Sequence, residues 1–560
     1  MSFYEEARQV GGGDYKTYLR MGDMIHAENN PALLPISLAC YVKSLELRPD
    51  NPMVYCRMGI LYKQLGQPRK AIAVLEKALE LDTAFIPARF NLLNVLCPVL
   101  YEKEEEIMEA RAAYEKELHA LCGTLRLDNE AEIKRAAQAV GRYPFHLAYQ
   151  GYNDVEFQRR YGELVCRIQT ARYPQWSGKK DMPPHNTGEP LRIGIVSGFF
   201  HDHSNWKMRI HGWLDAMDRS RFALYGYYTG KGNDDCTAFA RRSFNRFVEK
   251  EHSLTNLCQT IAADRLHVLI YPEIGMKALT LRLAALRLAP VQCTTWGHPT
   301  TSGLPTIDYY LSSDLMEPPD GQNAYTETLI RLPNLSVYYP PLEHKSAPLT
   351  REELGLSADR IIFLCPQSLY KYLPQHDDLF PRIAQAVGAC TFLFCTGDLS
   401  QPLVNQFRRR LAGAFDRYGL KSDDFILLKP MMDTPTYQAL NGLADIFLDS
   451  LEWSGCNTTM EAIACDLPVV TLPGRLMRGR HSMAILAMMG MSETIADTKK
   501  HYVELAVRLA TDSAWRAHIR KFMTANKHKL YRDKQSIRSL EAFLENAVAC
   551  HPLSRNRISL

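Results

Sequence analysis

The sequence lacks the common signatures of nucleotide and metal sites. No Gly-x-Gly-x-x-Gly follows a predicted strand, and no Gly-x-x-x-x-Gly-Lys-Ser/Thr occurs, which disfavours a dinucleotide dehydrogenase or a P-loop enzyme. The chain also has no Asp-x-Asp, which argues against a divalent-metal diphosphate site of that type. If the chain binds a diphosphate, we therefore expect Lys, Arg and helix N-termini to meet its charge, without a metal ion or another cofactor.

Disulfides, zinc sites and a strongly basic surface are likewise not indicated. The chain has 14 cysteines, none in a Cys-x-x-Cys pair, and most lie in apolar runs, as reduced and buried cysteines do. The net charge of +4 is small for 560 residues, and no long basic run appears. Composition therefore gives no reason to predict binding to nucleic acid.

Long apolar segments are missing too. No stretch approaches the roughly 18 continuous apolar residues of a membrane span, and the N-terminus has no apolar signal core. We therefore predict a cytoplasmic protein with no membrane partner. An apolar content of 46% and a charged content of 23% are typical of soluble globular proteins. The length predicts about three or four domains.

The first part of the chain contains a repeat. The segments 43–47 and 77–81, which read KSLEL and KALEL, lie 34 residues apart, and Gly22 and Gly59 hold matching positions. This period is typical of the tetratricopeptide repeat, a pair of helices that stacks on its neighbours. We predict a repeat region at 1–120 that binds a protein or peptide, with homodimerisation through the repeats as a further hypothesis. A purely structural helical cap is the alternative.

After the repeats, the pattern stays helical through a connector at 121–187 and then changes to short apolar runs. These runs alternate with helical segments, which predicts parallel sheets covered on both faces. The expected strands fall into two sets, 191–198, 223–230, 267–273, 291–297 and 309–314, then 361–368, 390–397, 425–431, 446–451 and 468–474.

These two sets predict an α/β fold of two Rossmann-like domains. We place the first at 188–345 and the second, with the helices that close the chain, at 346–560. Two such halves joined end to end form a ligand cleft at the carboxyl ends of their strands.

One βαβ unit at 445–474 holds a candidate phosphate cradle. The residues Ser454 to Thr459, SGCNTT, separate a short apolar run from a helical pattern with Met460 and Ile463 on one face. The first N–H groups of a helix have no partner inside it, so they are suited to bind an anion. Asn and Thr are also good helix caps, so an ordinary capped crossover helix is the alternative.

Further polar groups lie at predicted strand ends of the second half. Gln367 and Lys371 lie at the end of the strand 361–368, and Arg478, Arg480 and His481 follow the strand 468–474. A lone lysine at a strand end is usually a solvated surface residue. Several cationic or N–H-rich places on one half favour instead a diphosphate site built without a metal.

Several segments between 191 and 500 resemble the protein O-GlcNAc transferase and SPINDLY group of inverting glycosyltransferases. The segment 196–203, VSGFFHDH, resembles the group's Val-Ser-x-x-Phe-x-x-His, and 289–303 resembles its Ala-Pro-x-Gln stretch. Other matches follow in order: LYK at 369–371, LADIFLD at 443–449, GCNTTME at 455–461 and LPVVTLPG at 467–474. The group also carries N-terminal tetratricopeptide repeats. The resemblance implies the GT-B fold, with the donor held mainly by the second Rossmann-like domain.

The resemblance also implies roles for single residues. It gives catalytic roles to Lys371, the diphosphate-binding lysine, and to His203, the cleft histidine of the first domain. It implies that Glu461 binds the ribose and that Tyr437 stacks on the base, with backbone contacts near Met432. The remaining substrate-binding candidates lie in the turn or at strand ends: Gln367, Gly455, Cys456, Asn457, Thr458, Thr459, Arg480 and His298. His201, Asp202 and Glu273 are further strand-end candidates.

These residues suggest a physical mechanism. Inversion needs a nucleophile aimed at the anomeric carbon from the side opposite the leaving diphosphate, and alignment alone lowers the barrier by about 7–11 kcal/mol. Lys371 and the N–H groups at 457–459 would stabilise the leaving diphosphate. His203 would accept the acceptor's proton or only position the acceptor.

The turn leaves the donor open. The O-GlcNAc branch has His before two Thr, where this chain has Cys456-Asn457-Thr458-Thr459, and Gly-x-x-Thr-Thr-x-Glu is closer to the SPINDLY branch, whose donor is GDP-fucose. We favour transfer of one sugar from UDP-GlcNAc to Ser or Thr of a protein, with O-fucosylation or glucosylation of Asn as alternatives. A sugar-nucleotide epimerase and a non-catalytic repeat scaffold are more distant alternatives.

Overall fold

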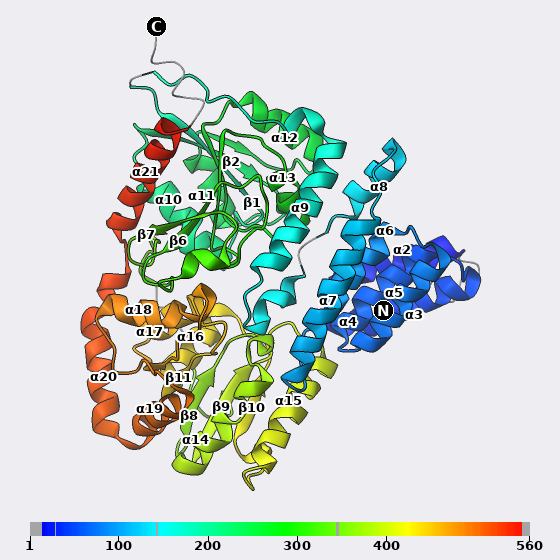
Figure 1. The fold of residues 1–560 in the computed structure, drawn as a ribbon. Helices are drawn as coiled ribbons and strands as arrows, with labels where there is room; N and C mark the ends of the chain where they lie inside the picture. Colours follow the sequence, from blue (N-terminus) through cyan, green and yellow to red (C-terminus); the bar gives the residue numbers. More distant parts are fainter. Residues whose placement is uncertain (1–13, 29, 142–143, 187, 343–346, 552–560) are drawn as a thin grey trace.

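The computed structural model describes residues 14–28, 30–141, 144–186, 188–342 and 347–551. The helical repeats, blue in Figure 1, lie beside two α/β halves, the first mainly green and the second yellow to orange. The expected boundary at 345/346 and the first 13 residues lie outside the described residues.

The N-terminal region consists of stacked helix pairs, as the 34-residue period predicts. The helices are α2 (Tyr15–Ala27), α3 (Leu34–Leu47), α4 (Pro52–Gln64), α5 (Pro68–Leu81), α6 (Ile86–Val95) and α7 (Glu105–Thr124). Two glycines allow close approach within the pairs, since a Cβ on Gly22 would lie 2.5 Å from the Tyr41 ring and one on Gly59 2.8 Å from Leu75. The last helix, α7, continues past the boundary expected at residue 120.

The connector joins the repeats to the first sheet. It comprises α8 (Glu130–Ala139), the 3-10 helix η2 (Phe145–Gln150), α9 (Val155–Arg172) and η3 (Pro174–Trp176). Leu164 and Val165 of α9 share one hydrophobic core with Leu118 of α7 and with Leu257 and Leu281 of the first half. The connector is therefore part of the packed body, and Figure 1 shows α9 between the repeats and the first sheet.

The first half is a parallel sheet with the order β3-β2-β1-β4-β5-β6-β7. Its strands are β1 (Leu191–Ser197), β2 (Phe222–Tyr228), β3 (Arg246–Val248), β4 (Val268–Tyr271), β5 (Val291–Thr295), β6 (Tyr309–Ser313) and β7 (Thr328–Leu332). Its helices are the π-helical turn η4 (Trp206–Ile210), α10 (His211–Ala216), α11 (Asp235–Ser243), α12 (Leu254–Ala263), α13 (Ala278–Ala284) and the 3-10 turn η5 (Gly321–Ala324). The sequence patterns missed β3 and β7 because these edge strands are partly exposed and do not form buried apolar runs.

The second half is a smaller parallel sheet with the order β10-β9-β8-β11-β12. Its strands are β8 (Ile361–Cys365), β9 (Cys390–Cys395), β10 (Ile426–Lys429), β11 (Ile446–Leu448) and β12 (Val469–Val470). Its helices are η6 (Leu369–Lys371), η7 (Pro374–His376), α14 (Leu379–Val387), α15 (Gln401–Asp416), η8 (Ser422–Asp424), α16 (Thr434–Leu443), α17 (Asn457–Ala464), η9 (Met477–Gly479) and α18 (His481–Met489). The two sheets confirm the expected pair of Rossmann-like halves.

The helices that close the chain divide between the halves. They are α19 (Lys499–Thr511), α20 (Ser513–Asn526), η10 (Lys527–Leu530) and α21 (Lys534–Ala549). We expected all of them to belong to the second half, but α21 returns to the first, where Ile537, Leu540 and Leu544 pack into its core. Arg221 also pairs with Glu545 of α21 at 2.6 Å. Figure 1 shows this return along one side of the molecule.

Both sheets have a topological switch point, where successive crossovers leave in opposite directions. In the first sheet the switch lies between β1 and β4, and in the second between β8 and β11. Ligands of open α/β sheets bind at such points, outside the carboxyl ends of the strands. The loops after β1, β4, β8 and β11 are therefore the places to look for a site.

Two further expectations concern the chain as a whole. All 14 cysteines are free thiols, and most are buried. Among the described residues, none of the helices combines the length and the apolar character needed to cross a bilayer.

Replacing Gly162 by alanine tests the packing of the connector. A Cβ on Gly162, in the middle of α9, would meet the backbone of Gly303, which cannot move aside as a side chain can. We expect Gly162→Ala to destabilise the protein by about 2–4 kcal/mol. Gly413→Ala, in the last turn of α15, is the control because a Cβ there has nothing within 4 Å, and it should stabilise the protein by up to about 1 kcal/mol. Thermal melts of both variants check this, and equal melting temperatures would contradict the close backbone contact.

Candidate functional site

A buried carboxylate organises the loop after β11. Asp449 accepts hydrogen bonds from the Gly455 N–H at 2.7 Å, from Ser454 Oγ at 2.6 Å and from Thr471 Oγ1 at 2.8 Å. Gln367 Nε2, at the end of β8, donates to it at 3.4 Å. Burial raises the pKa of Asp449, and these donors oppose the shift. One side chain thus ties the turn at 454–455 to the ends of neighbouring strands.

The turn leads into α17 without an ordinary side-chain cap. Cys456 occupies the N-cap position and makes no capping hydrogen bond. The side chain of Asn457 points elsewhere, since its Nδ2 donates to Glu461 Oε1 at 2.7 Å and its Oδ1 accepts from the Tyr339 hydroxyl at 2.9 Å. Within the described residues, the N–H groups that open α17 are therefore not capped by a side chain, and the alternative of an ordinary capped helix is not what the chain forms.

Gly455 is required in this turn by close packing. A Cβ at this position would lie 2.7 Å from Oγ1 of both Thr458 and Thr459. Thr459 Oγ1 in turn lies 2.7 Å from Ser482 Oγ, which is 2.9 Å from Ser454 Oγ. The turn is held by a network of short polar side chains.

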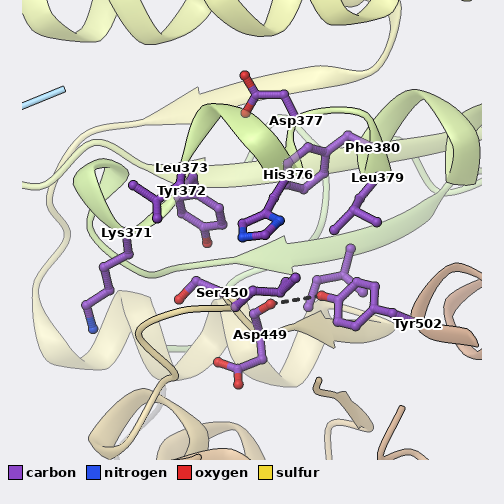
Figure 2. Close-up of a pocket in the computed structure, with 12 residues that line it drawn as sticks. Lys371, Tyr372, Leu373, His376, Asp377, Leu379, Phe380, Asp449, Ser450 and Tyr502 are labelled. Carbon is purple, nitrogen blue, oxygen red and sulfur yellow. Dashed lines mark hydrogen bonds between the residues drawn. The ribbon is translucent and has the colours of Figure 1, made fainter. Parts of the chain in front are cut away.

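Lys371 is the last residue of η6, the short helix that follows β8, and it lies near this turn. Its Nζ is 5.7 Å from the centre of the Trp453 ring, and among the described residues it forms no hydrogen bond or ion pair. Burial lowers the pKa of Lys371 to about 8, while the negative charge of Asp449 opposes the shift. Figure 2 shows its side chain extending from η6 toward the segment of Asp449 and Ser450. An ammonium group that is partly desolvated and forms no ion pair is suited to bind an anionic ligand.

Lys371 is also one of the residues that line the cavity drawn in Figure 2. The volume of this cavity is ≈ 10 Å³, which is about the room that one water molecule needs. His376 and Tyr502 line it, and the Tyr502 hydroxyl donates to the backbone carbonyl of Asp449 at 2.9 Å. The cavity is therefore too small to hold a nucleotide.

The candidates for binding the nucleoside lie on the neighbouring elements. Tyr437 is on α16, Met432 is half-buried in the loop before it, and Glu461 follows on α17. The charge of Glu461 acts on Tyr437, whose pKa is raised, mainly by burial. Burial also raises the pKa of Glu461 to about 7, against the effects of Lys207 and Asn457. The structure thus brings these expected residues together with Asn457.

His203 lies in the loop after β1, at the switch point of the first sheet. Its ring stacks on Phe199 at 4.0 Å, and its Nδ1 accepts the backbone N–H of Asn205 at 3.1 Å. Burial lowers the pKa of His203 to about 4. The ring is therefore neutral, and because Nδ1 accepts, the proton lies on Nε2. This tautomer is suited to donate a hydrogen bond to a substrate and not to accept a proton.

The other strand-end candidates of the first half have structural partners. Glu273 is buried and accepts from the Gly198 N–H at 2.8 Å, so it shapes the loop after β1. His201 pairs with the Tyr228 hydroxyl at 2.9 Å, and Asp202 pairs with Lys207 at 2.7 Å.

His298 lies after β5 and faces the connector. Its ring stacks on Phe145 at 5.5 Å, and burial lowers the pKa of His298 to about 3. It is a neutral, buried side chain between the two halves, 6.1 Å from the Trp453 ring.

The residues after β12 do not form the expected cluster of positive charge. Arg478 is buried and pairs with Asp154 of the connector at 2.9 Å. Arg480 Nε donates to the Met316 carbonyl of the first half at 3.0 Å. Burial, Lys371 and Arg209 lower the pKa of His481 to about 3, so it carries no charge. Arg478 and Arg480 instead connect segments that are distant in sequence.

Some residues of the site were not predicted. Tyr149 of η2 stacks on Trp453 at 3.9 Å and meets Tyr370 at 4.7 Å, so the connector adds an aromatic wall beside Lys371. The sequence pattern places Asp449 within a predicted strand and indicates no role for it. The signal for it was an acid at a strand end with Ser-Gly five residues later.

Metal ligands are not gathered in this region. Within the ranges that the structure describes, no three His, Cys, Asp or Glu side chains lie together in a way that would hold a metal ion.

The fold and the site together define a class. Two parallel Rossmann-like halves, with polar loops at both switch points, form the GT-B architecture of glycosyltransferases. The model of glycosyl transferase family 41 matches residues 151–339 and 342–540, and a tetratricopeptide-repeat model matches 54–85. The chain therefore belongs to glycosyl transferase family 41. Its sequence is similar to the SPINDLY proteins of plants.

Known relatives agree with this family. The probable UDP-N-acetylglucosamine–peptide N-acetylglucosaminyltransferase SPINDLY of Arabidopsis thaliana is 25% identical over 385 residues, which is 65% of this chain and 39% of that protein. The UDP-glucose:protein N-beta-glucosyltransferase of Actinobacillus pleuropneumoniae is 23% identical over 400 residues, 68% of this chain and 60% of that protein. The chain thus spans about two fifths of the length of SPINDLY.

A solved structure has the same fold. A mutant of the Thermobaculum terrenum O-GlcNAc transferase superposes with a TM-score of 0.70 at 23% identity, and the match covers 97% of this chain and 99% of that chain.

The pKa of Glu461 predicts a pH dependence of stability. The carboxyl has an ordinary pKa of 4.5 and a folded-state pKa of about 7. Between these values the folded protein holds a proton that the unfolded chain has lost, so this contribution is full below pH 4.5 and is lost as the pH rises through 7. Glu461→Gln cannot ionise and should gain about 1–3 kcal/mol relative to the wild type between pH 5 and pH 8.

Melts of both proteins at a series of pH values measure this difference. Glu504→Gln, on the exposed face of α19, is the control whose difference from the wild type should stay level. If the difference in stability between Glu461→Gln and the wild type is also the same at every pH, the raised pKa of Glu461 is contradicted.

Proposed function

We propose that the protein transfers a single sugar from a nucleotide sugar to a protein acceptor, with inversion and without a metal ion. The observation that carries the proposal is the arrangement at the second switch point. There Lys371 has no anionic partner among the described residues, and it lies beside the uncapped start of α17 and a turn fixed by Asp449. Such a site is suited to a diphosphate, and a glycosyltransferase of this family has one to bind.

The leaving group is the part of the reaction that this site would stabilise. Negative charge develops on the diphosphate as the glycosidic bond to it breaks. The Lys371 ammonium and the N–H groups of Asn457 to Thr459 are fixed donors, and donors that need no reorganisation contribute most to stabilising such charge. Because these groups replace a metal ion, the proposal includes no cofactor besides the nucleotide sugar.

The first half would hold the acceptor. His203, with its proton on Nε2, would donate a hydrogen bond and position the acceptor or the sugar, and it would not act as the base. Tyr437, Met432 and Glu461 would bind the base and ribose of the donor.

The acceptor and donor classes follow from the relatives and the repeats. The names of both relatives specify a UDP-sugar donor and a peptide or protein acceptor. We therefore favour UDP-GlcNAc as donor and Ser or Thr of a protein held by the repeats as acceptor. O-Fucosylation from GDP-fucose is the second candidate, because the turn reads Gly-x-x-Thr-Thr-x-Glu. Homodimerisation through the repeats and a cytoplasmic location belong to the same proposal.

Replacing Lys371 separates catalysis from folding. Lys371→Met removes a partly desolvated cation, so the fold should survive with an equal or higher melting temperature. The variant also loses the charge that meets the leaving diphosphate, and we expect transfer to fall about 100-fold or more. The measurements are a thermal melt and transfer of labelled sugar to peptide mixtures.

Lys421→Met is the matched control, because Lys421 is an exposed lysine of the same half, and it should transfer at the wild-type rate. Wild-type transfer by Lys371→Met would contradict the role given to Lys371, whereas the absence of transfer by the wild type itself would favour the non-catalytic scaffold alternative.

A thermal-shift panel tests the donor. We expect UDP and UDP-GlcNAc to raise the melting temperature more than GDP and GDP-fucose do, since a ligand that binds only the folded protein stabilises it. A stronger response to GDP would move the proposal to fucosyl transfer. Conversion of UDP-GlcNAc to an epimer without labelled peptide would replace it by the epimerase alternative.

A further inference from the structure

The first half contributes a buried arginine that faces the second half. Arg209, in η4, is 5% exposed, and no carboxylate of the described residues pairs with it. Its Nη2 donates to the Trp296 carbonyl at 2.8 Å and its Nη1 to Asn205 Oδ1 at 3.2 Å, while its Nε has no hydrogen-bond partner among the described residues. A buried charge without an opposite charge is costly. An anionic ligand would offset that cost.

A buried histidine contacts the same tryptophan. Arg209 stacks on the Trp296 ring at 3.6 Å, and the His481 ring lies 5.5 Å from that ring. His481 opens α18 and is 3% exposed. The Ser454 backbone interacts with its ring, but neither ring nitrogen makes a hydrogen bond of good geometry within the described residues. Buried polar atoms are nearly always satisfied in folded proteins, so such a side chain also points to a ligand.

Both side chains adjoin the candidate phosphate cradle. The residue after His481, Ser482, donates its N–H to Ser454 Oγ at 2.9 Å, and its hydroxyl contacts Thr459 Oγ1. Cys456, the N-cap of α17, feels the positive charges of Arg209 and Lys371, which oppose the raising of its pKa by burial. The start of α17 is therefore close enough to interact with the positive charges of Arg209 from the first half and Lys371 from the second.

We propose that Arg209 and His481 complete the pocket for the donor's diphosphate, together with Lys371 and the start of α17. Arg209 supplies the second positive charge, and it comes from the half that holds the acceptor. His481 supplies a neutral N–H donor beside it. This inference rests on the proposed function. It means that the diphosphate site is complete only when the two halves are in contact.

Binding measurements with matched nucleotides test the inference. Titration calorimetry compares UDP with UMP, and GDP with GMP, on the wild type, Arg209→Met and His481→Phe. The wild type should bind the diphosphate more tightly than the monophosphate. In each variant the ratio of these two affinities should fall at least about tenfold, while the monophosphate still binds. Arg209→Lys keeps the charge but loses the planar fork, so it should fall between the wild type and Arg209→Met.

Arg241→Met is the control, because Arg241 is an exposed arginine paired with Glu249 on the same half, and it should keep the wild-type preference. Unchanged preference in the folded Arg209→Met and His481→Phe variants would overturn the inference. If Arg209→Met does not fold, His481→Phe carries the test, and an unchanged preference there overturns it. If the wild type binds none of the four nucleotides, the proposed function fails. That outcome is distinct from a failure of this inference.

Discussion

The candidate site depends on the hydrogen bonds that the buried Asp449 carboxylate accepts. A carboxylate is stable in such a place only if donors surround it, and here they come from Ser454, Gly455, Thr471 and Gln367. Because those donors lie on separate loops, satisfying one buried charge fixes the turn before α17 relative to the ends of β8 and β12. The uncapped start of α17 and the neighbouring Lys371 then face the same space.

The two halves meet through polar and aromatic contacts around that space. Arg480 donates to the Met316 carbonyl, the Tyr339 hydroxyl donates to Asn457, and α21 returns to the first sheet. The buried histidines of this region add no charge to it. The buried histidines His203, His298 and His481 are neutral because burial lowers the pKa of each. Lys371 and Arg209 are two cations near the start of α17 that pair with no carboxylate among the described residues.

Local patterns predicted most of the fold. The 34-residue period and the glycines Gly22 and Gly59 were sufficient for the repeats, because helix pairing of this kind repeats in sequence. Buried parallel strands form continuous apolar runs, so most of both sheets could be read directly. The partly exposed edge strands β3 and β7 lack that signal, and the packing of α21 on the first sheet depends on a partner about 300 residues earlier, Arg221.

The sequence alone determined which family the chain resembles and where the turn, Lys371 and His203 lie, because these are short ordered motifs. Only the tertiary structure decided how the neighbouring polar groups are used. Arg478, placed beside the site by its strand end, pairs with Asp154 of the connector, whereas Arg209, with no motif around it, stacks on Trp296, which also contacts His481. Burial and partners distant in sequence set the charge and the direction of a side chain, and neither is encoded in its immediate neighbours.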